Sequence, residues 1–167
     1  GQNTTGHDNT LIGGYAGWKL GSGTNNTAVG AGALQSSGTV ANNTGQYNSA
    51  FGVGALAGNS SGNNNTAMGF QALISNTTAS GSAAVGYQAL LNNTTGVQNT
   101  AVGSIALKSN TTGALLEAFG QGALTTNTTG NNNSAFGYVA LGLNTTGSQN
   151  VAVGQSALYS NTTASYN

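Results

Sequence analysis

The apolar and polar positions of this chain recur with a period of 17 residues, and each period is centred on a glycine. The repeated unit reads approximately N-N-T-A-V-G-x-x-A-L-x-x-N-T-T-G, and the interval between central glycines departs from 17 once, where it is 22. A fixed period of this length is typical of one small structural unit stacked on copies of itself. The central glycines are Gly13, Gly30, Gly52, Gly69, Gly86, Gly103, Gly120, Gly137 and Gly154.

Two apolar columns accompany the glycines, and we expect both to point into the core. The residue before each glycine is always apolar, and the fourth residue after it is leucine in every unit except the first, which has Gly17. An alanine always stands third after the glycine, where we expect backbone or a neighbouring chain to approach closely. The predicted core columns are Val29, Phe51, Met68, Val85, Val102, Phe119, Phe136 and Val153, and Leu34, Leu56, Leu73, Leu90, Leu107, Leu124, Leu141 and Leu158.

The residue types in each unit favour strands and turns over a helix. Glycine, asparagine and threonine are poor helix formers, whereas N-T-A-V-G suits a short strand and A-L a second one. The central glycine and N-T-T-G are turn sequences, because glycine and asparagine tolerate positive φ. The pattern predicts an all-β parallel β-solenoid (β-roll) of about nine coils, as one domain over residues 1–167, with a five-residue insertion near 36–41 as a surface loop.

Asparagine forms two further columns. One lies four residues before the glycine, and the other begins the Asn-Thr-Thr turns. An Asn-x-Thr sequence is also an N-glycosylation acceptor, but recurrence at the structural period favours a ladder of stacked amides. The columns are Asn9, Asn26, Asn48, Asn65, Asn99, Asn133 and Asn150, and Asn59, Asn76, Asn93, Asn110, Asn127, Asn144 and Asn161.

Charge is almost absent from the chain, which has Lys19, Lys108, Asp8 and Glu117 as its four formal charges, with no proline and no cysteine. In a parallel stack, equivalent positions lie about 4.8 Å apart, so a charge in the repeat would become a column of like charges. With no basic patch we expect no nucleic-acid partner, and no apolar run suits membrane insertion. Lys108 and Glu117 stand on successive coils and could form an ion pair, within a chain or between chains.

The titratable groups are too few and too scattered for catalysis. Asp8 and Glu117 lie about six coils apart, on the order of 30 Å at 4.8 Å per coil, whereas paired glycosidase carboxyls lie roughly 5–10 Å apart. His7 and Asp8 could gather around an axis as a metal site, although a solvated loop is favoured. We therefore expect no enzyme activity, no cofactor and no metal.

Aromatic side chains are the best candidates for surface contacts, because their rings stack on sugars and anchor proteins. Packing between coils or chains is the alternative. The candidates are Tyr15, Trp18, Tyr47, Phe70, Tyr87, Tyr138 and Tyr159.

The units N-N-T-A-V-G and N-N-S-A-F-G resemble the N-S-V-A-I-G repeat of trimeric autotransporter adhesin heads, which has a shorter period. They also resemble N-T-A-x-G-x-x-A-L arrays of bacteriophage tail fibres. The resemblance implies a homotrimer of left-handed parallel β-rolls on an extracellular or virion fibre. Burial within a single thin coil is too small to offset the entropy of ordering it, which also favours homo-oligomers.

These observations predict a structural or adhesive extracellular fibre, surface filament or adhesin-head shaft. We expect the chain to be an excerpt of a longer array or a subunit that stacks end to end. Its partners would be further copies of itself and a host-surface glycan or protein. The alternatives are a bacteriophage tail-fibre segment and an ice-binding solenoid, although adjacent threonines in a strand would face opposite ways. A polysaccharide-processing β-helix is disfavoured by the missing carboxylates.

Overall fold

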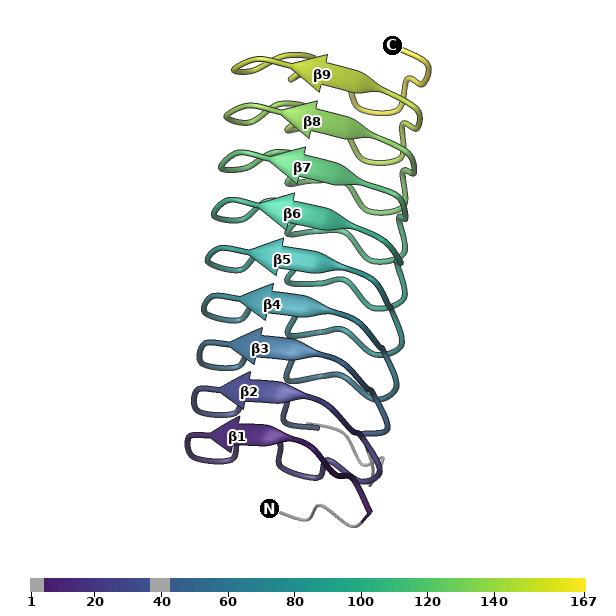
Figure 1. Cartoon of the computed structure of the whole chain (residues 1–167). Helices are drawn as coiled ribbons and strands as arrows, with labels where there is room; N and C mark the ends of the chain where they lie inside the picture. Colours follow the sequence, from purple (N-terminus) through teal and green to yellow (C-terminus); the bar gives the residue numbers. More distant parts are fainter. Residues whose placement is uncertain (1–4, 37–42) are drawn as a thin grey trace.

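The chain forms a parallel β-solenoid in the computed structural model, which describes residues 5–36 and 43–167 (Figure 1). Within these ranges, nine strands lie in one sheet in the order of the sequence, so that eight turns separate the first strand from the last. This confirms the predicted fold class. The strands are β1 (Thr10–Ile12), β2 (Thr27–Val29), β3 (Ser49–Phe51), β4 (Thr66–Met68), β5 (Ala83–Val85), β6 (Thr100–Val102), β7 (Glu117–Phe119), β8 (Ser134–Phe136) and β9 (Val151–Val153).

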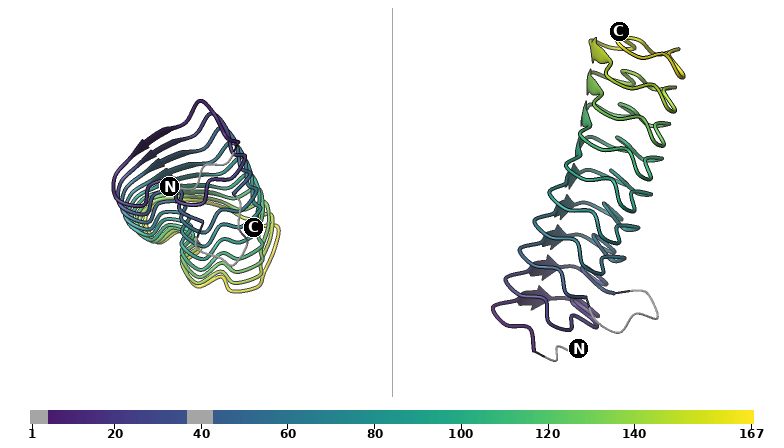
Figure 2. Two further views of the ribbon diagram at one scale, coloured as in Figure 1. Left: turned by 90° about the horizontal axis from the view of Figure 1, so that it is seen from below. Right: turned by 90° about the vertical axis from the view of Figure 1, so that its right-hand side faces the viewer.

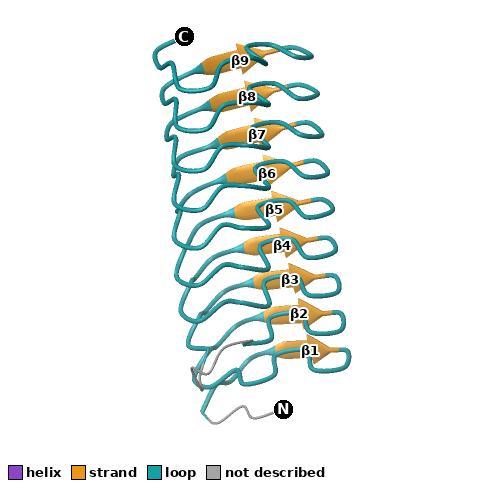
Figure 3. Cartoon of the chain, turned by 180° about the vertical axis from the view of Figure 1, so that it is seen from behind, coloured by secondary structure: helices purple, strands orange, loops and turns teal. Residues whose placement is uncertain are grey.

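Each strand pairs in parallel with its equivalent in the next coil, as Thr100 does with Glu117. The strands therefore share one face of the rod, and turns and loops form the rest of each coil (Figures 1 and 3). Seen along the rod, successive coils follow the same outline and shift gradually from one to the next (Figure 2). The repeat of the sequence is thus also the repeat of the backbone.

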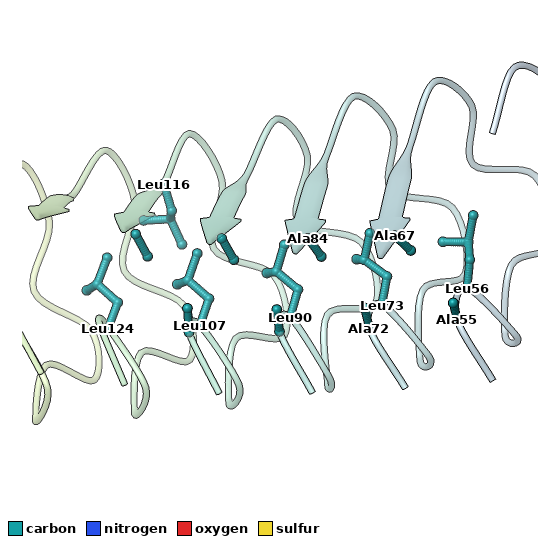
Figure 4. Packing of buried hydrophobic residues seen from close by; sticks show 14 of the residues in the cluster. Ala55, Leu56, Ala67, Ala72, Leu73, Ala84, Leu90, Leu107, Leu116 and Leu124 are labelled. Atoms are coloured by element: carbon teal, nitrogen blue, oxygen red, sulfur yellow. The ribbon is translucent and has the colours of Figure 1, made fainter. Parts of the chain in front are cut away.

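The core is a column of leucines packed against two columns of alanines. The middle residue of each strand from β2 onward is an alanine with almost no exposed surface, and the alanines third after the glycines from Ala33 to Ala140 are also fully buried. In Figure 4 the leucine side chains extend toward these strand alanines. The leucine column is confirmed from Leu34 to Leu141, whereas Leu158 is 38% exposed because no further coil lies over it.

The residues before the glycines face outward, so the prediction that they line the core is wrong. Side chains alternate along a strand, and in each three-residue strand from β2 onward the middle alanine takes the inward position, which directs its two neighbours to the outer face. The coil is thin, and opposite a leucine it has room for alanine and not for valine or phenylalanine. The side chains of Val29 and Val102 are half-buried, and those of Phe51, Met68, Val85, Phe119, Phe136 and Val153 are exposed.

The A-L segment is a turn rather than the second strand that the sequence suggested. Its leucines have φ near +52°, as at Leu90 and Leu107, a left-handed conformation that ordinarily disfavours residues with a side chain. From Leu34 to Leu141, each leucine N–H of this column donates to the alanine carbonyl of the next coil; the bond from Leu90 N–H to Ala106 O is 3.0 Å long. We infer that burial of the leucine side chain offsets the backbone strain.

The predicted surface loop at 36–41 falls almost entirely on residues 37–42, outside the described ranges. Only Ser36 is described there, and it is buried, with its N–H donating to Trp18 O at 3.0 Å.

Candidate functional surface

After the leucine in each coil, the inside of the solenoid contains a ladder of asparagine amides that runs from Asn43 to Asn161. Asn110 is representative: its Nδ2 donates to Asn93 Oδ1 at 2.8 Å and to Gly113 O at 2.9 Å, and its Oδ1 accepts from Asn127 Nδ2 at 3.0 Å. These amides are fully buried from Asn43 to Asn144. A glycan on Nδ2 is incompatible with this burial and these bonds, so the Asn-Thr-Thr repeats serve the ladder in the folded chain.

A second ladder lies just before the strands and ties each coil to the next through its backbone. Asn48 Oδ1 accepts from the N–H of Asn65 at 3.0 Å, while Asn48 Nδ2 donates to Gly62 O at 2.9 Å. Leu116 interrupts this ladder with a buried apolar side chain that offers no acceptor to the N–H of Asn133. The interior is therefore occupied by the fold itself, and the residues available for function lie on the outer surface.

The most continuous feature of that surface is an apolar column that we call the outer stripe. It consists of the residues before the central glycines, from Ile12 to Val153, with one apolar side chain in every coil. Phe119 and Phe136 are 39% and 37% exposed and stack on each other with ring centroids 5.2 Å apart and planes inclined by 10°. The members are Ile12, Val29, Phe51, Met68, Val85, Val102, Phe119, Phe136 and Val153.

Four of the residues that follow the glycines are also large, apolar and exposed, and widen the stripe: Val53, Phe70, Tyr87 and Tyr138. They lie two residues from the stripe, which places their Cα atoms within about 7 Å of it. The rings of Phe70 and Tyr87 stack with centroids 5.6 Å apart and an interplanar angle of 8°. Within residues 5–36 and 43–167, no other part of the chain covers this apolar surface.

The structure gathers only some of the aromatic residues that the sequence suggested as contacts. Phe70, Tyr87 and Tyr138 lie beside the stripe. Tyr15 and Trp18 pack edge to face in the first turn, with centroids 5.5 Å apart, and Tyr159 is exposed in the last coil. The stripe itself was not predicted as a surface, although the alternation of T-A-V about a recurring alanine could have revealed it.

The charged residues do not assemble into a site. Lys108 and Glu117 form no ion pair within the chain. Glu117 lies beside Thr100 of the previous coil. Lys108 follows Thr100 by eight residues, so about half a coil separates Lys108 from Glu117. Glu117 Oε2 instead accepts from Ser134 Oγ at 3.2 Å, and an ion pair between chains stays a prediction. Exposed His7 Nδ1 lies 2.8 Å from Asp8 Oδ2, and no group of three potential metal ligands exists among the described residues.

Residues 5–36 and 43–167 form strands and turns, and they contain no helix that is long and apolar enough to cross a membrane. Searches against protein-family descriptions, curated proteins and solved structures found no match to this chain.

Proposed function

We propose that this chain is a repeat segment of an extracellular structural or adhesive fibre, in which several copies pack along their outer stripes. The observation that carries the proposal is the unbroken apolar column on the outer face of the sheet. Soluble monomers rarely expose contiguous apolar patches beyond a few hundred Å², and larger ones mark interaction surfaces. The interior needs no such column, because alanine, leucine and asparagine already fill it.

A second copy of the same chain is the partner that best fits the stripe. The stripe offers one side chain per coil, about every 4.8 Å, along nine consecutive strands. A partner that contacts the stripe over this length must present its side chains at the same spacing, and another copy of this chain has that spacing because its coils are identical. Closed symmetry around a common axis would bury all copies of the stripe together, and the resemblance to adhesin heads and tail fibres favours three copies.

The near-absence of charge supports the same arrangement. Glu117 is the one formally charged side chain on the nine strands, and it stands at the start of β7, two residues from the stripe position Phe119. Desolvating ionic groups opposes association, and the stripe has none. Adhesion, the extracellular or virion location and the binding of a host glycan or protein belong to the same proposal through the resemblance.

The assembly can be tested by comparing two double variants, each of which replaces two similarly exposed apolar side chains by threonine. Phe119→Thr with Phe136→Thr removes two stacked rings from the stripe. Val97→Thr with Leu143→Thr removes exposed apolar side chains from outside it. Because interface aromatics contribute strongly to binding, the stripe variant should raise the dissociation constant of the assembly at least about tenfold, and the control should leave it unchanged.

Mass measurement by light scattering over a range of concentrations would report the dissociation constants, with circular dichroism to show that each variant folds. Electron microscopy should show rods. A wild-type chain that stays monomeric at every concentration would refute assembly through the stripe, as would equal effects of the two double variants.

The geometry gives less support to ice binding. From Thr77 to Thr145, the first threonine of each Asn-Thr-Thr turn donates its hydroxyl to the next coil, as Thr94 Oγ1 does to Thr111 O at 3.0 Å. Only the second threonine, such as Thr95, is exposed, and Val97 occupies the position two residues later. A regular surface of two threonine rows is therefore not formed, and thermal hysteresis in the purified protein would be the direct sign that ice binding nevertheless occurs.

A further inference from the structure

The 22-residue interval between β2 and β3 contains two separate changes to the repeat. Six residues are added between Leu34 and Asn43, which stand 9 apart where Leu73 and Asn76 stand 3 apart. One residue is also missing between Asn43 and Gly45, which are separated by Thr44 alone. In a regular turn two residues separate the asparagine from the small residue that closes the turn, as between Asn59 and Gly62. The net change is five, but the deletion is the part that alters a described surface.

The hydrogen bonds identify the missing residue. In a regular turn the N–H groups of two successive residues donate to one carbonyl of the next coil, as those of Ser60 and Ser61 do to Thr77 O at 2.9 and 3.1 Å. In the short turn Thr44 N–H alone donates to Ser60 O, at 2.8 Å, and Gly45 N–H donates to Asn43 Oδ1 at 2.8 Å. The position of the second, exposed hydroxyl residue is vacant in this coil.

The vacancy leaves an open notch of about 500 Å³ in the side of the rod, a volume in the range of small-molecule sites. Ser22 and Ser61, from the coils on either side, flank the place of the missing residue, and Thr44 lies between them. The carboxamides of Gln46, Asn63 and Asn64 complete the polar lining, together with the ring of Tyr47.

The lining is chemically specific in what it offers. It contains no ionised side chain, so it suits neither a metal cation nor a phosphate or carboxylate. Its hydroxyls and carboxamides each donate and accept hydrogen bonds, and within residues 5–36 and 43–167 the carboxamides of Gln46 and Asn64 make no bond of their own. Tyr47 is 58% exposed and presents an aromatic face beside them.

We propose that this notch binds a short neutral saccharide. Sugar hydroxyls donate and accept in the same way as the lining, and the apolar face of a pyranose packs on an aromatic ring. The notch contains no residue of the outer stripe: Ser61 follows Gly52 by nine residues in a coil of 17, and Tyr47 stands four residues before the stripe residue Phe51. The proposal gives the adhesive part of the proposed function a site and a ligand class, and in that respect it rests on that function, but the site does not require assembly.

Two variants remove the site without threatening the fold. Tyr47 has a φ of +57°, and the equivalent residue in the next coil, Asn64, has the same φ, so Tyr47→Asn deletes the ring while keeping a residue that tolerates this backbone. Insertion of one threonine after Thr44 restores the regular turn and fills the notch. Tyr166→Asn is the matched control, because Tyr166 occupies the same column with a φ of +63° and is not among the residues that line this notch.

The probes are lactose, maltose, cellobiose and N,N′-diacetylchitobiose, with sialyllactose as an acidic comparison, measured by saturation-transfer NMR and calorimetry on the whole chain. At least one neutral sugar should bind, and Tyr47→Asn and the insertion should each weaken it about tenfold or more, while Tyr166→Asn leaves it unchanged. Failure of all neutral sugars, binding of sialyllactose alone, or undiminished binding in both notch variants would overturn the proposal.

The same measurement on the Phe119→Thr, Phe136→Thr protein separates this proposal from the assembly. Sugar binding that persists when the stripe is disrupted supports a site complete in one chain. Loss of sugar binding with the stripe alone would place the ligand elsewhere and overturn the notch, whatever the oligomeric state.

Discussion

At the scale of single residues, the glycine after each strand meets two separate constraints. At Gly86 the φ is +138°, and an added Cβ would lie 2.5 Å from Gly103 O in the next coil. Gly154 has a similar φ of +120° but nothing within 4 Å, and Gly14 has neither a positive φ nor a neighbour within 4 Å. The three positions therefore separate backbone strain from steric exclusion.

We expect Gly86→Ala to lower the free energy of unfolding by about 2–5 kcal/mol, because strain and overpacking add. Gly154→Ala should cost about 1–2 kcal/mol through strain alone, and Gly14→Ala should change stability by less than about 0.5 kcal/mol. Urea denaturation followed by circular dichroism measures all three. Equal losses at Gly86 and Gly154 would show that the contact between coils contributes nothing.

The positive φ of the central glycines could be predicted from the sequence, but the conformation of the leucines could not. Glycines that recur at the same turn position in every repeat point to a backbone conformation with positive φ. Leu90 adopts φ +52° against its intrinsic preference, because this places its side chain in the core at no exposure. Local propensity carries no information about such an override, since the driving contact comes from neighbouring coils.

At the scale of elements, the buried asparagine ladder should be worth more in the middle of the solenoid than at its end. Asn110→Ala removes two donated bonds and one accepted bond in a dry interior, and should destabilise the chain by about 2–4 kcal/mol. Asn161 also donates to Asn144 Oδ1 and to Ala164 O, but it is half-buried, and water can replace its partners.

Asn161→Ala is accordingly the control, with an expected loss of about 1 kcal/mol or less. Thermal and urea unfolding of both variants give the comparison. If the two substitutions cost the same, the ladder would be a consequence of coil stacking rather than a contributor to it.

The strand register makes the exclusion of charge testable. Thr100 and Glu117 are direct neighbours on β6 and β7, about 4.8 Å apart. Thr100→Glu should destabilise the pairing by a few tenths to about 1 kcal/mol, and Thr100→Lys should stabilise it by a similar amount. Thr100→Gln is the uncharged control.

Salt distinguishes this effect from a change in strand propensity. The difference in unfolding free energy between the Glu and Lys variants should be smaller in 1 M sodium chloride than at low salt, because the Debye length at 1 M is only about 3 Å and the charges are screened. A difference that survives high salt would mean that side-chain packing, not charge, sets the preference for threonine at this position.

The period of the repeat and the positions of the strands could be predicted from the sequence. Hydrophobicity alone could not predict which residues of a strand point into the core. Val85 is more apolar than Ala84, yet Ala84 is buried and Val85 is exposed. The size of the coil interior decides this, and it depends on how 17 residues close into a turn. The alternation was visible in T-A-V, but its phase needed the three-dimensional outline. The notch could not be predicted from the sequence either, because the loss of one residue after Asn43 was hidden in the net gain of five residues in this coil.

At the scale of the whole molecule, the solenoid is held by contacts between consecutive coils, since each strand contacts only the strand before and the strand after it. Stability in such an array is a sum of coil and neighbour terms, and opening can start at either end. We therefore expect amide hydrogen exchange to be slowest in β4 to β6 and progressively faster toward β1 and β9.

The interrupted ladder should add a local exception to this gradient. Asn26 and Asn133 stand before β2 and β8, each one coil from an end strand, and Asn26 N–H donates to Asn9 Oδ1 at 2.9 Å. Because Leu116 gives Asn133 N–H no such acceptor, the Asn133 amide should exchange at least about tenfold faster than that of Asn26, in line with the loss of one hydrogen bond. Leu116→Asn should slow it. Uniform protection from hydrogen exchange along the rod would instead mean that all the coils open together, and that the interruption of the ladder at Leu116 has no local effect.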